Sequence, residues 1–410
     1  MDLFKSDSVN STLGIELDSE YPYQPGDVAT GRIYRKSPVD SPYATVKLRL
    51  NGQVRTKIPQ FNGQMQILDQ SQVVHDGPIH LPSGEIRQEW PFTLKIPTHI
   101  DSACLPTDAN PKKYFFPLRN DDGTTAILPP TFDGTYDSDR KAVIEYILEA
   151  EMQLEGQGKS GKSKAVLLIT IEYFHAGEPL ASTPFNFGQK ELSVSSPRLI
   201  PGKENTKLST SQKMKGLFSS RSTPTFTFQV MIAIPKLIQL GNPYFVPFQM
   251  KATPLWDKSH ESLRGSPPKI VVKRFALEVI TRVTVMGPLN SGVGRFWDRN
   301  RVINTNLALM RLGYELEVPC DEGSTPAVDL GKAVKFQIPY EKEMNFHANH
   351  LRPSFDTHLI RNVHILKWRV ELDVVGKNFV IEDHHYFNAV PPVSPYAAHS
   401  TSGGKEGAGL

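Results

Sequence analysis

Cysteine is almost missing from this sequence, and its scarcity excludes two kinds of structure. The 410 residues include only Cys104 and Cys320, which lie far apart in the chain. Small secreted domains that depend on disulfides contain many cysteines, and cysteine-based zinc sites use closely spaced pairs. The sequence therefore predicts neither a disulfide framework nor a cysteine-based zinc site.

Long apolar segments are missing as well. No stretch approaches the roughly 18 consecutive apolar residues of a membrane-spanning helix, and Met1–Ser11 lacks the apolar stretch of a secretory signal. Hydrophobic residues nevertheless make up 39% of the chain, which is enough to bury a sizeable core. We expect a soluble, intracellular protein with two or three domains.

Helical periodicity is also scarce, and alternation of apolar and polar residues replaces it. The 33 prolines and 29 glycines favour many short strands over a few long helices. Period-two alternation is typical of strands with one buried and one wet face, as in antiparallel sandwiches. The best helix candidate, at 304–311, is short. The expected strands cover 90–96, 146–154, 226–234, 275–285 and 364–374.

The same order of features occurs in both halves of the chain. Each half has a strand end, then a turn of Pro, Ser or Thr, and Phe, and then a long alternating strand, which suggests two sandwiches of similar topology. The segments are 92–97, 130–132 and 144–154 in the first half, and 336–339, 353–355 and 363–375 in the second.

The predicted domain boundaries follow from this repeat and from composition. We expect an N-terminal sandwich over 1–195 and a C-terminal sandwich over 222–390. Residues 196–221 between them are rich in Ser, Thr, Lys and Gly, as in a flexible basic linker. The tail over 391–410 contains several glycines and is expected to be disordered.

Charge is distributed unevenly although the net charge is only +3. Residues 1–200 carry 20 basic and 25 acidic side chains, and the remaining residues carry 26 and 18. The basic excess lies between Lys203 and Arg274, as either an anion-facing surface or a solvated loop. The stretch from Lys203 to Arg221 has one aromatic residue, Phe218, so we expect no nucleic-acid binding.

Several short motifs, in order along both halves, resemble a known family. The chain resembles arrestin-like proteins, specifically the fungal alpha-arrestin group of arrestin-related trafficking adaptors, over nearly all of residues 12–390. The motifs are Tyr23–Gly31 with its Pro-Gly-Asp turn, Val46–Gly52, Trp90–Pro97, Leu128–Phe132 with Ile144–Tyr146, and Pro353–Phe355 with His364–Leu366.

The resemblance implies an all-β protein with two arrestin-type, immunoglobulin-like β-sandwich domains in tandem. It implies a non-catalytic cytoplasmic adaptor without cofactors, recruited to the plasma membrane or endosomes, that links the cytoplasmic tails of transporters or receptors to ubiquitination and endocytosis. Many members bind a HECT-type ubiquitin ligase through Pro-Pro-x-Tyr. This chain lacks that motif. The most similar segment is 391–396, where Tyr396 directly follows Pro395 and the spacing is wrong. The resemblance therefore does not extend to direct recruitment of a ligase.

Two other functions of the same architecture stay open. One is a signalling scaffold without a link to a ubiquitin ligase, and the other is a retromer-like trafficking subunit with a stable stoichiometric partner. Either would be a peripheral, non-catalytic protein.

A nucleotide-binding motif provides an alternative from another class. Gly156–Ser163 fits G-x-x-x-x-G-K-[ST] at every fixed position. In a P-loop this segment precedes a helix and wraps a phosphate chain, but here a β-branched run that is typical of a strand follows at 165–171. A hairpin between two antiparallel strands therefore explains the match better than nucleotide binding.

Neither metal binding nor catalysis is predicted from the polar residues. His384 and His385 are adjacent and would point to opposite faces of a strand, and His347 and His350 follow no helix that would align them. Nothing places either cysteine beside a histidine. Paired carboxylates such as Glu149 and Glu151 are typical of a solvated strand face.

Four cations form the candidate site for cargo or other anions. Lys47 and Arg49 lie on the wet face opposite Val46, Leu48 and Leu50, and Arg55 and Lys57 follow. Such a row can receive phosphate or carboxylate groups, and basic residues of the N-terminal domain do this in arrestin-type proteins. Ordinary surface charge is the alternative interpretation.

Overall fold

The computed structural model describes the chain over the ranges 12–19, 22–59, 61–84, 87–106, 114–115, 119, 122–157, 161–200, 223–286, 295–303, 305–323, 325–340 and 351–394. Of the expected linker, residues 201–221 lie outside this part, and so do residues 395–410 of the expected tail, and His347 and His350. None of the helices in the described ranges is long and apolar enough to span a bilayer.

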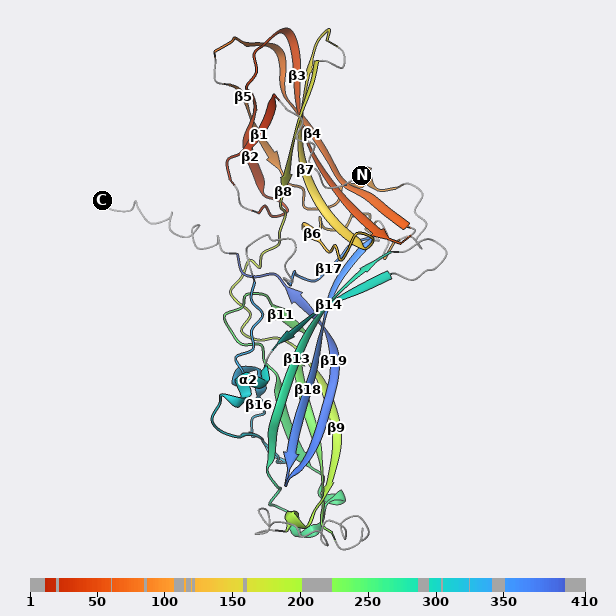
Figure 1. Ribbon diagram of the computed structural model, residues 1–410, viewed down its shortest axis with the longest axis vertical. Helices are drawn as coiled ribbons and strands as arrows, with labels where there is room; N and C mark the ends of the chain where they lie inside the picture. The colour runs from red at the N-terminus through yellow and green to blue at the C-terminus, as the bar shows by residue number, and fades with distance from the viewer. Residues whose placement is uncertain are drawn as a thin grey trace, which may run out of the picture. The chain divides into compact units, whose positions relative to one another are not determined.

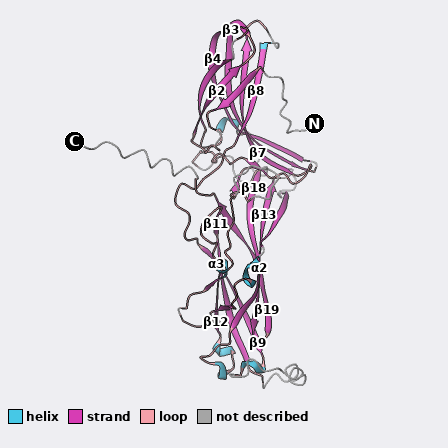
Figure 2. Ribbon diagram, turned by 60° about the vertical axis from the view of Figure 1, so that its left-hand side comes forward, coloured by secondary structure: helices cyan, strands magenta, loops and turns pink. Residues whose placement is uncertain are grey.

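Strands dominate the described residues, which confirms the prediction of an all-β protein (Figure 2). The chain divides into two compact units. Unit 1 comprises 1–174, 283–297 and 355–362, and unit 2 comprises 175–282, 298–354 and 363–410.

The first half of the chain supplies most strands of unit 1 (Figure 1). They are β1 (Leu13–Leu17), β2 (Val28–Arg35), β3 (Val39–Ile58), β4 (Phe61–Leu81), β5 (Gln88–Lys95), β6 (Phe132–Asp133), β7 (Lys141–Leu154) and β8 (Lys162–Ile169).

The strands and helices of the second half are β9 (Phe185–Ser195), β10 (Thr225–Pro235), β11 (Leu237–Gln239), β12 (Gln249–Pro254), β13 (Ile270–Val285), β14 (Arg295–Ile303), α2 (Thr305–Met310), β15 (Leu316–Val318), β16 (Val328–Asp329), α3 (Leu330–Ala333), β17 (Phe355–Asp356), β18 (Ile360–Val374) and β19 (Lys377–Val390). The short helix α2 confirms the candidate at 304–311.

Unit 1 contains two sheets with one shared core. One sheet has the order β1-β2-β5, and the other has the order β4-β3-β7-β6, with β8 also paired to β7. Alternate residues are buried in β2, β5, β7 and β3. In β3, for example, Val46, Leu48 and Leu50 are inaccessible. These side chains join Ile33 of β2 and Phe92 of β5 in a single hydrophobic cluster. The apolar side of each sheet therefore faces the core, as in a β-sandwich.

Unit 2 has the same construction from a different set of strands. Most of its strands lie in sheets with the orders β16-β12-β10-β9 and β11-β19-β18-β13-β14, and β15 pairs with β13. The short strand β17, which pairs with the start of β18, belongs to unit 1, as do the first residues of β14 and β18. The pairing of β11 with β19 is parallel, whereas the described pairing of β9, β10 and β12 is antiparallel. A second hydrophobic cluster, including Phe228, Phe248 and Trp368, fills this unit.

The boundaries between the units differ from the expected domains at two places. The strand β9 was expected in the N-terminal sandwich, but it pairs with β10 over its full length and belongs to unit 2. Conversely, segments of the expected C-terminal domain belong to unit 1. There, the indole Nε1 of Trp297 donates to the carbonyl of Gly134 at 3.0 Å, and Phe355 packs edge-on against Phe132 with ring centroids 4.9 Å apart.

The repeated order of features is partly confirmed. Both Pro-(Ser/Thr)-Phe turns lead into short strands, β6 and β17, which pair with the long strands β7 and β18. The first strand end, at 92–97, belongs to β5. The second, at 336–339, is not a strand, although Phe336 and Ile338 are buried in the core of unit 2. Apolar alternation over only four residues reports burial there and not strand pairing.

Candidate functional site

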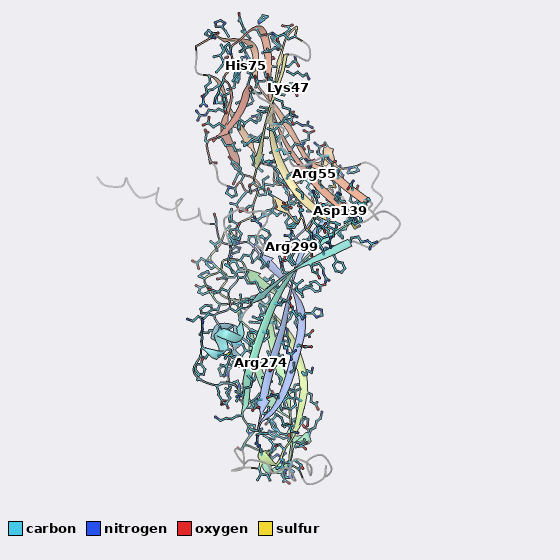
Figure 3. The ribbon with its side chains drawn as sticks, viewed as in Figure 1. Lys47, Arg55, His75, Asp139, Arg274 and Arg299 are labelled. Carbon is cyan, nitrogen blue, oxygen red and sulfur yellow. The ribbon has the colours of Figure 1, made fainter. Side chains whose placement is uncertain are left out.

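The four predicted cations lie on one face of β3, on the side away from the core. Lys47 is exposed, and Arg49, Arg55 and Lys57 are partly buried. Lys47 and Arg55 lie at separate points along the strand (Figure 3). A strand rises by about 3.3 Å per residue, so Lys47 and Lys57 are roughly 30 Å apart along β3. The four cations therefore share a face but cannot all contact one small anion.

Acidic side chains from other segments neutralise three of the four cations. The guanidinium of Arg49 binds Asp69 of β4 through two bonds, Nε to Oδ1 at 2.5 Å and Nη2 to Oδ2 at 2.6 Å. These hydrogen bonds lower the pKa of Asp69 and raise that of Arg49. Arg55 Nη2 lies 2.5 Å from Glu145 Oε2.

Lys57 is held at the end of the strand. Its Nζ lies 3.3 Å from Asp139 Oδ1 and donates to the carbonyl of Ser138 at 2.9 Å. Lys47 differs from the others, because its side chain has no ion-pair or hydrogen-bond partner among the residues that the structure describes. The row is thus mostly a set of cross-strand ion pairs, and Lys47 is its available cation.

The segment that matches the P-loop motif connects two antiparallel strands. The strand β7 pairs with β8 from Tyr146 opposite Ile169 to Gln153 opposite Lys162, which confirms the predicted hairpin. The motif lysine, Lys162, is the first residue of β8, and its Nζ lies 3.3 Å from Glu151 Oε1. A strand in place of the helix provides no ring of backbone amides at a helix N-terminus for a phosphate chain.

The described histidines of β19 and the two cysteines are not arranged as a catalytic or metal-binding group. His384 is exposed on β19, whereas His385 is turned inward and stacks on Trp368 with an interplanar angle of 6°. Burial raises the pKa of the Cys104 thiol to about 11 and that of Cys320 to about 12. Both thiols therefore stay protonated at neutral pH and are weak nucleophiles. Within the described ranges, no three His, Cys, Asp or Glu side chains cluster as metal ligands would.

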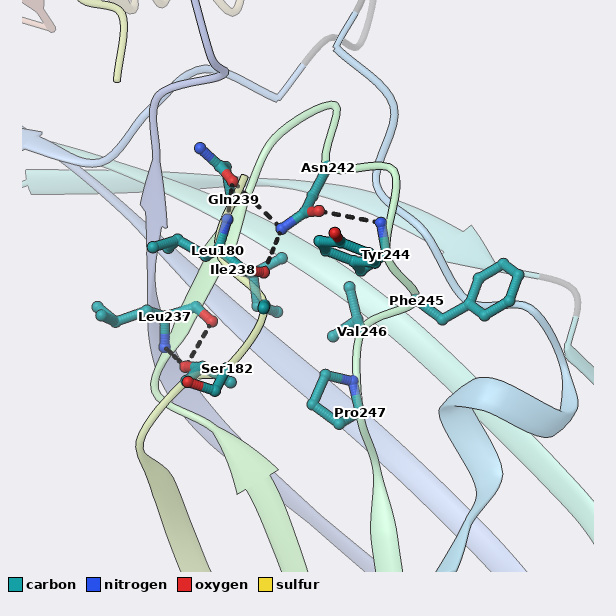
Figure 4. Close-up of a pocket in the computed structure, with 12 residues that line it drawn as sticks. Leu180, Ser182, Leu237, Ile238, Gln239, Asn242, Tyr244, Phe245, Val246 and Pro247 are labelled. Carbon is teal, nitrogen blue, oxygen red and sulfur yellow. Dashed lines mark hydrogen bonds between the residues drawn. The ribbon is translucent and has the colours of Figure 1, made fainter. Parts of the chain in front are cut away.

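A small cavity of unit 2 is lined by two side-chain amides that are hydrogen-bonded within the protein (Figure 4). Its volume is about 40 Å³, far below the roughly 300–1,000 Å³ of typical ligand pockets. The buried amide of Gln239 accepts from the backbone N–H of Leu180 at 2.8 Å and from Asn242 Nδ2 at 3.2 Å. Asn242 in turn donates to the carbonyl of Leu180 at 2.9 Å. These bonds connect two segments of unit 2, so the amides of Gln239 and Asn242 have a structural role.

The edge strand β9 is the feature that sequence reasoning missed. It ends the order β16-β12-β10-β9, so only one of its sides is paired with a described strand. Phe187 on this strand is 65% exposed, and its ring lies 6.3 Å from that of Phe185. A Cβ placed on the neighbouring Gly188 would meet no atom within 4 Å, so the face of the sheet above this glycine is open. Alternation of Phe185 and Phe187 was the only sequence signal, and the polar run 189–191 interrupts it.

Comparison with known proteins found no relative. No protein-family model matches the sequence, and none of the curated proteins matches it significantly.

Proposed function

We propose that this chain is a non-catalytic adaptor of two arrestin-type β-sandwiches that links transporters or receptors to ubiquitination and endocytic trafficking. The proposal rests on the ordered motifs of the sequence together with two compact all-β units, each with its own core. The partly buried, protonated thiols and the P-loop-like hairpin give no support to a catalytic alternative.

The observation that carries the proposal is the edge of β9, which no described strand covers. An unpaired strand edge presents a row of backbone N–H and C=O groups, which natural proteins usually protect. An extended peptide can add to such an edge through main-chain hydrogen bonds, and side-chain contacts then give specificity. The exposed ring of Phe187 supplies an apolar contact for such a peptide.

The partner in this proposal is an extended segment from the cytoplasmic tail of a membrane protein. The adaptor would be cytoplasmic and would reach the plasma membrane or endosomes by binding its cargo there. A HECT-type ubiquitin ligase would join through another component, because the chain has no Pro-Pro-x-Tyr motif. Among the predicted cations, Lys47 is the one that remains available for acidic cargo, since carboxylates occupy the others.

Proximity labelling of the tagged full-length protein in its native cells tests this function. We expect enrichment of membrane transporters or receptors together with ubiquitin-ligase or endocytic components. The variant Phe187→Lys removes the exposed ring and should lose this enrichment, because truncating an aromatic anchor costs about 2 kcal/mol or more, roughly 30-fold in affinity. Phe187 is 65% exposed, so the substitution leaves the core intact.

A matched control is Leu168→Lys on β8, where the leucine is 67% exposed in unit 1. This variant should keep the enrichment. Absence of membrane and trafficking proteins from the wild-type sample would refute the adaptor function. Equal enrichment in Phe187→Lys would instead remove β9 as the docking edge. A further variant, Lys47→Ala, should lower the labelling of cargo with acidic tails.

A further inference from the structure

Arg35 at the end of β2 is a buried cation that contacts no carboxylate among the residues that the structure describes. Its side chain is 8% exposed, and it is the only lysine, arginine, aspartate or glutamate among the buried residues of the described part. It lies on the core face of its strand, in line with Ile33. Burial lowers its pKa from the usual value, but an arginine stays charged in proteins. The charge therefore persists on a side chain that is largely covered by protein.

Every hydrogen-bond partner of Arg35 is neutral. Nε donates to the carbonyl of Ser37 at 3.1 Å. Nη1 faces three acceptors, Thr12 Oγ1 at 3.1 Å, Ser163 Oγ at 3.3 Å and Met152 Sδ at 3.6 Å. Nη2 has no hydrogen-bond partner in the described part of the chain. Other arginines of the same unit, such as Arg32 and Arg49, are in contact with carboxylates although they are more exposed.

Further polar groups beside Arg35 also lack partners within the described residues. The hydroxyl of Ser37, whose carbonyl binds Arg35, is buried and makes no hydrogen bond, and the same holds for Oε1 of Gln88. Gln88 on β5 stands directly opposite Arg35 in the register of β2 and β5, and so shares its face of the sheet. The hydroxyls of Thr12 and Ser163 lie 3.4 Å apart. One of them donates a hydrogen bond to the other, and the proton of the acceptor hydroxyl can be donated to another group.

This combination of a guanidinium and neighbouring hydroxyl groups suits a ligand with negative charge. A buried ion without a partner costs several kcal/mol, and buried charges in proteins are normally paired. An ordered water could satisfy a hydroxyl or an amide, but it cannot neutralise a guanidinium. Arginine and hydroxyl donors together match the geometry of phosphate or sulfate oxygens.

We propose that Arg35, Thr12, Ser37 and Ser163 form a binding site for a small tetrahedral oxyanion of the phosphate class, where β1, β2 and β8 of unit 1 meet. The low exposure of Arg35 favours a small ion over a bulky ligand. The ion neutralises the guanidinium through Nη2 and accepts protons from the hydroxyls. It thereby ties the start of β8 to the other sheet of the unit. This site is independent of the docking edge on β9, which lies in unit 2.

Thermal unfolding of the full chain in sodium phosphate tests this site, with sodium chloride at equal ionic strength as reference. At a phosphate concentration of about 100 times Kd, one unfolding transition should rise by roughly 5–10 °C, because a ligand of the native state stabilises it by mass action. Calorimetric titration with phosphate should give one binding site per chain. Equal transition temperatures in phosphate and chloride, without binding heat, would overturn the proposal.

Variants separate the site from general effects of charge. Arg35→Met should abolish the response to phosphate, while its transition in chloride stays the same or rises, since an apolar side chain replaces an unpaired ion. Arg32→Met, on the same strand but exposed and paired with Asp18, should keep the full response. Ser163→Ala keeps the guanidinium and should weaken phosphate binding about tenfold, the loss of one hydrogen bond to a charged group. A full phosphate response in Arg35→Met would refute the assignment.

A phosphate monoester distinguishes the source of the oxyanion. O-phosphoserine at the same concentration should reproduce the shift if the site takes a phosphate that a larger molecule carries. A response to inorganic phosphate alone would assign the site to the free ion. Either result requires Arg35, which the Arg35→Met variant verifies in the same experiment.

Discussion

A buried histidine should make unit 2 sensitive to acid. His364 on β18 is inaccessible and stacks on Phe387 of β19 at 5.5 Å. Its Nε2 lies 2.8 Å from the carbonyl of Arg352, which can only accept, so Nε2 carries the proton. Nδ1 then accepts from Thr281 Oγ1 at 3.1 Å. The neutral ring is thus fully hydrogen-bonded, and a second proton would place a charge inside the core.

The size of the effect follows from the pKa. Burial lowers the pKa of His364 from 6.5 to about 4 in the folded state. As the pH falls below 6.5, His364 becomes protonated in the unfolded chain, whereas in the folded chain it becomes protonated only near pH 4. The free energy of unfolding therefore decreases as the pH is lowered from 6.5 to 4. The stabilisation is complete above pH 6.5. Its loss should reach about 2 kcal/mol at pH 5 and about 3 kcal/mol at pH 4.

Denaturant unfolding at pH 7.5 and at pH 5 measures this loss. The variant His364→Gln keeps a side chain that can donate and accept but cannot become charged there. It should therefore lose about 2 kcal/mol less than the wild type on acidification. His384→Gln, at an exposed position of β19, serves as the matched control and should behave as the wild type. An equal loss in His364→Gln and wild type would refute the reasoning.

Three further predictions concern unit 1. Tyr146→Phe removes the buried hydroxyl that donates to the carbonyl of Pro129 at 2.5 Å, and the orphaned carbonyl should cost about 1–3 kcal/mol in denaturant unfolding; an unchanged midpoint would contradict the importance of that bond. Gly31→Ala should disrupt the β1–β2 pairing and lower the melting temperature, because its Cβ would lie 2.3 Å from the backbone oxygen of Glu16 and such overpacking costs about 1–3 kcal/mol; normal stability would show that β1 can move away. MgATP should give no binding heat in calorimetry, whereas a micromolar signal that Lys162→Ala abolishes would restore the nucleotide-binding alternative.

The strands of the fold could be predicted from the sequence because each carries its own signal. Apolar and polar residues alternate within β7, β10 and β18, and a strand with one buried face requires that pattern locally. The strand that follows the P-loop match could also be predicted from neighbouring residues, because the run after Lys162 is rich in β-branched side chains. Four-residue patterns such as 336–339 were too short to separate burial from strand pairing.

The candidate sites were less predictable, because they depend on residues distant in the chain. Sequence placed Arg49 and Arg55 correctly on the outer face of β3. It could not reveal that Asp69 and Glu145 would come beside them, since cross-strand neighbours are set by pairing and register. The exposed side of β9 was hidden for the same reason: a strand becomes an edge only when the order of the sheet is known.

The sequence by itself determined that this protein consists mainly of antiparallel strands, that too few cysteines are present for a disulfide framework, and that the cations of β3 face outward. Only the tertiary structure decided which charges are neutralised. Arg35 and Arg49 are both arginines on strands, yet one is buried beside neutral hydroxyls and the other is paired with a carboxylate on the surface. Alternation fixes the side to which a residue points, whereas the partner that it meets there depends on how distant strands come together.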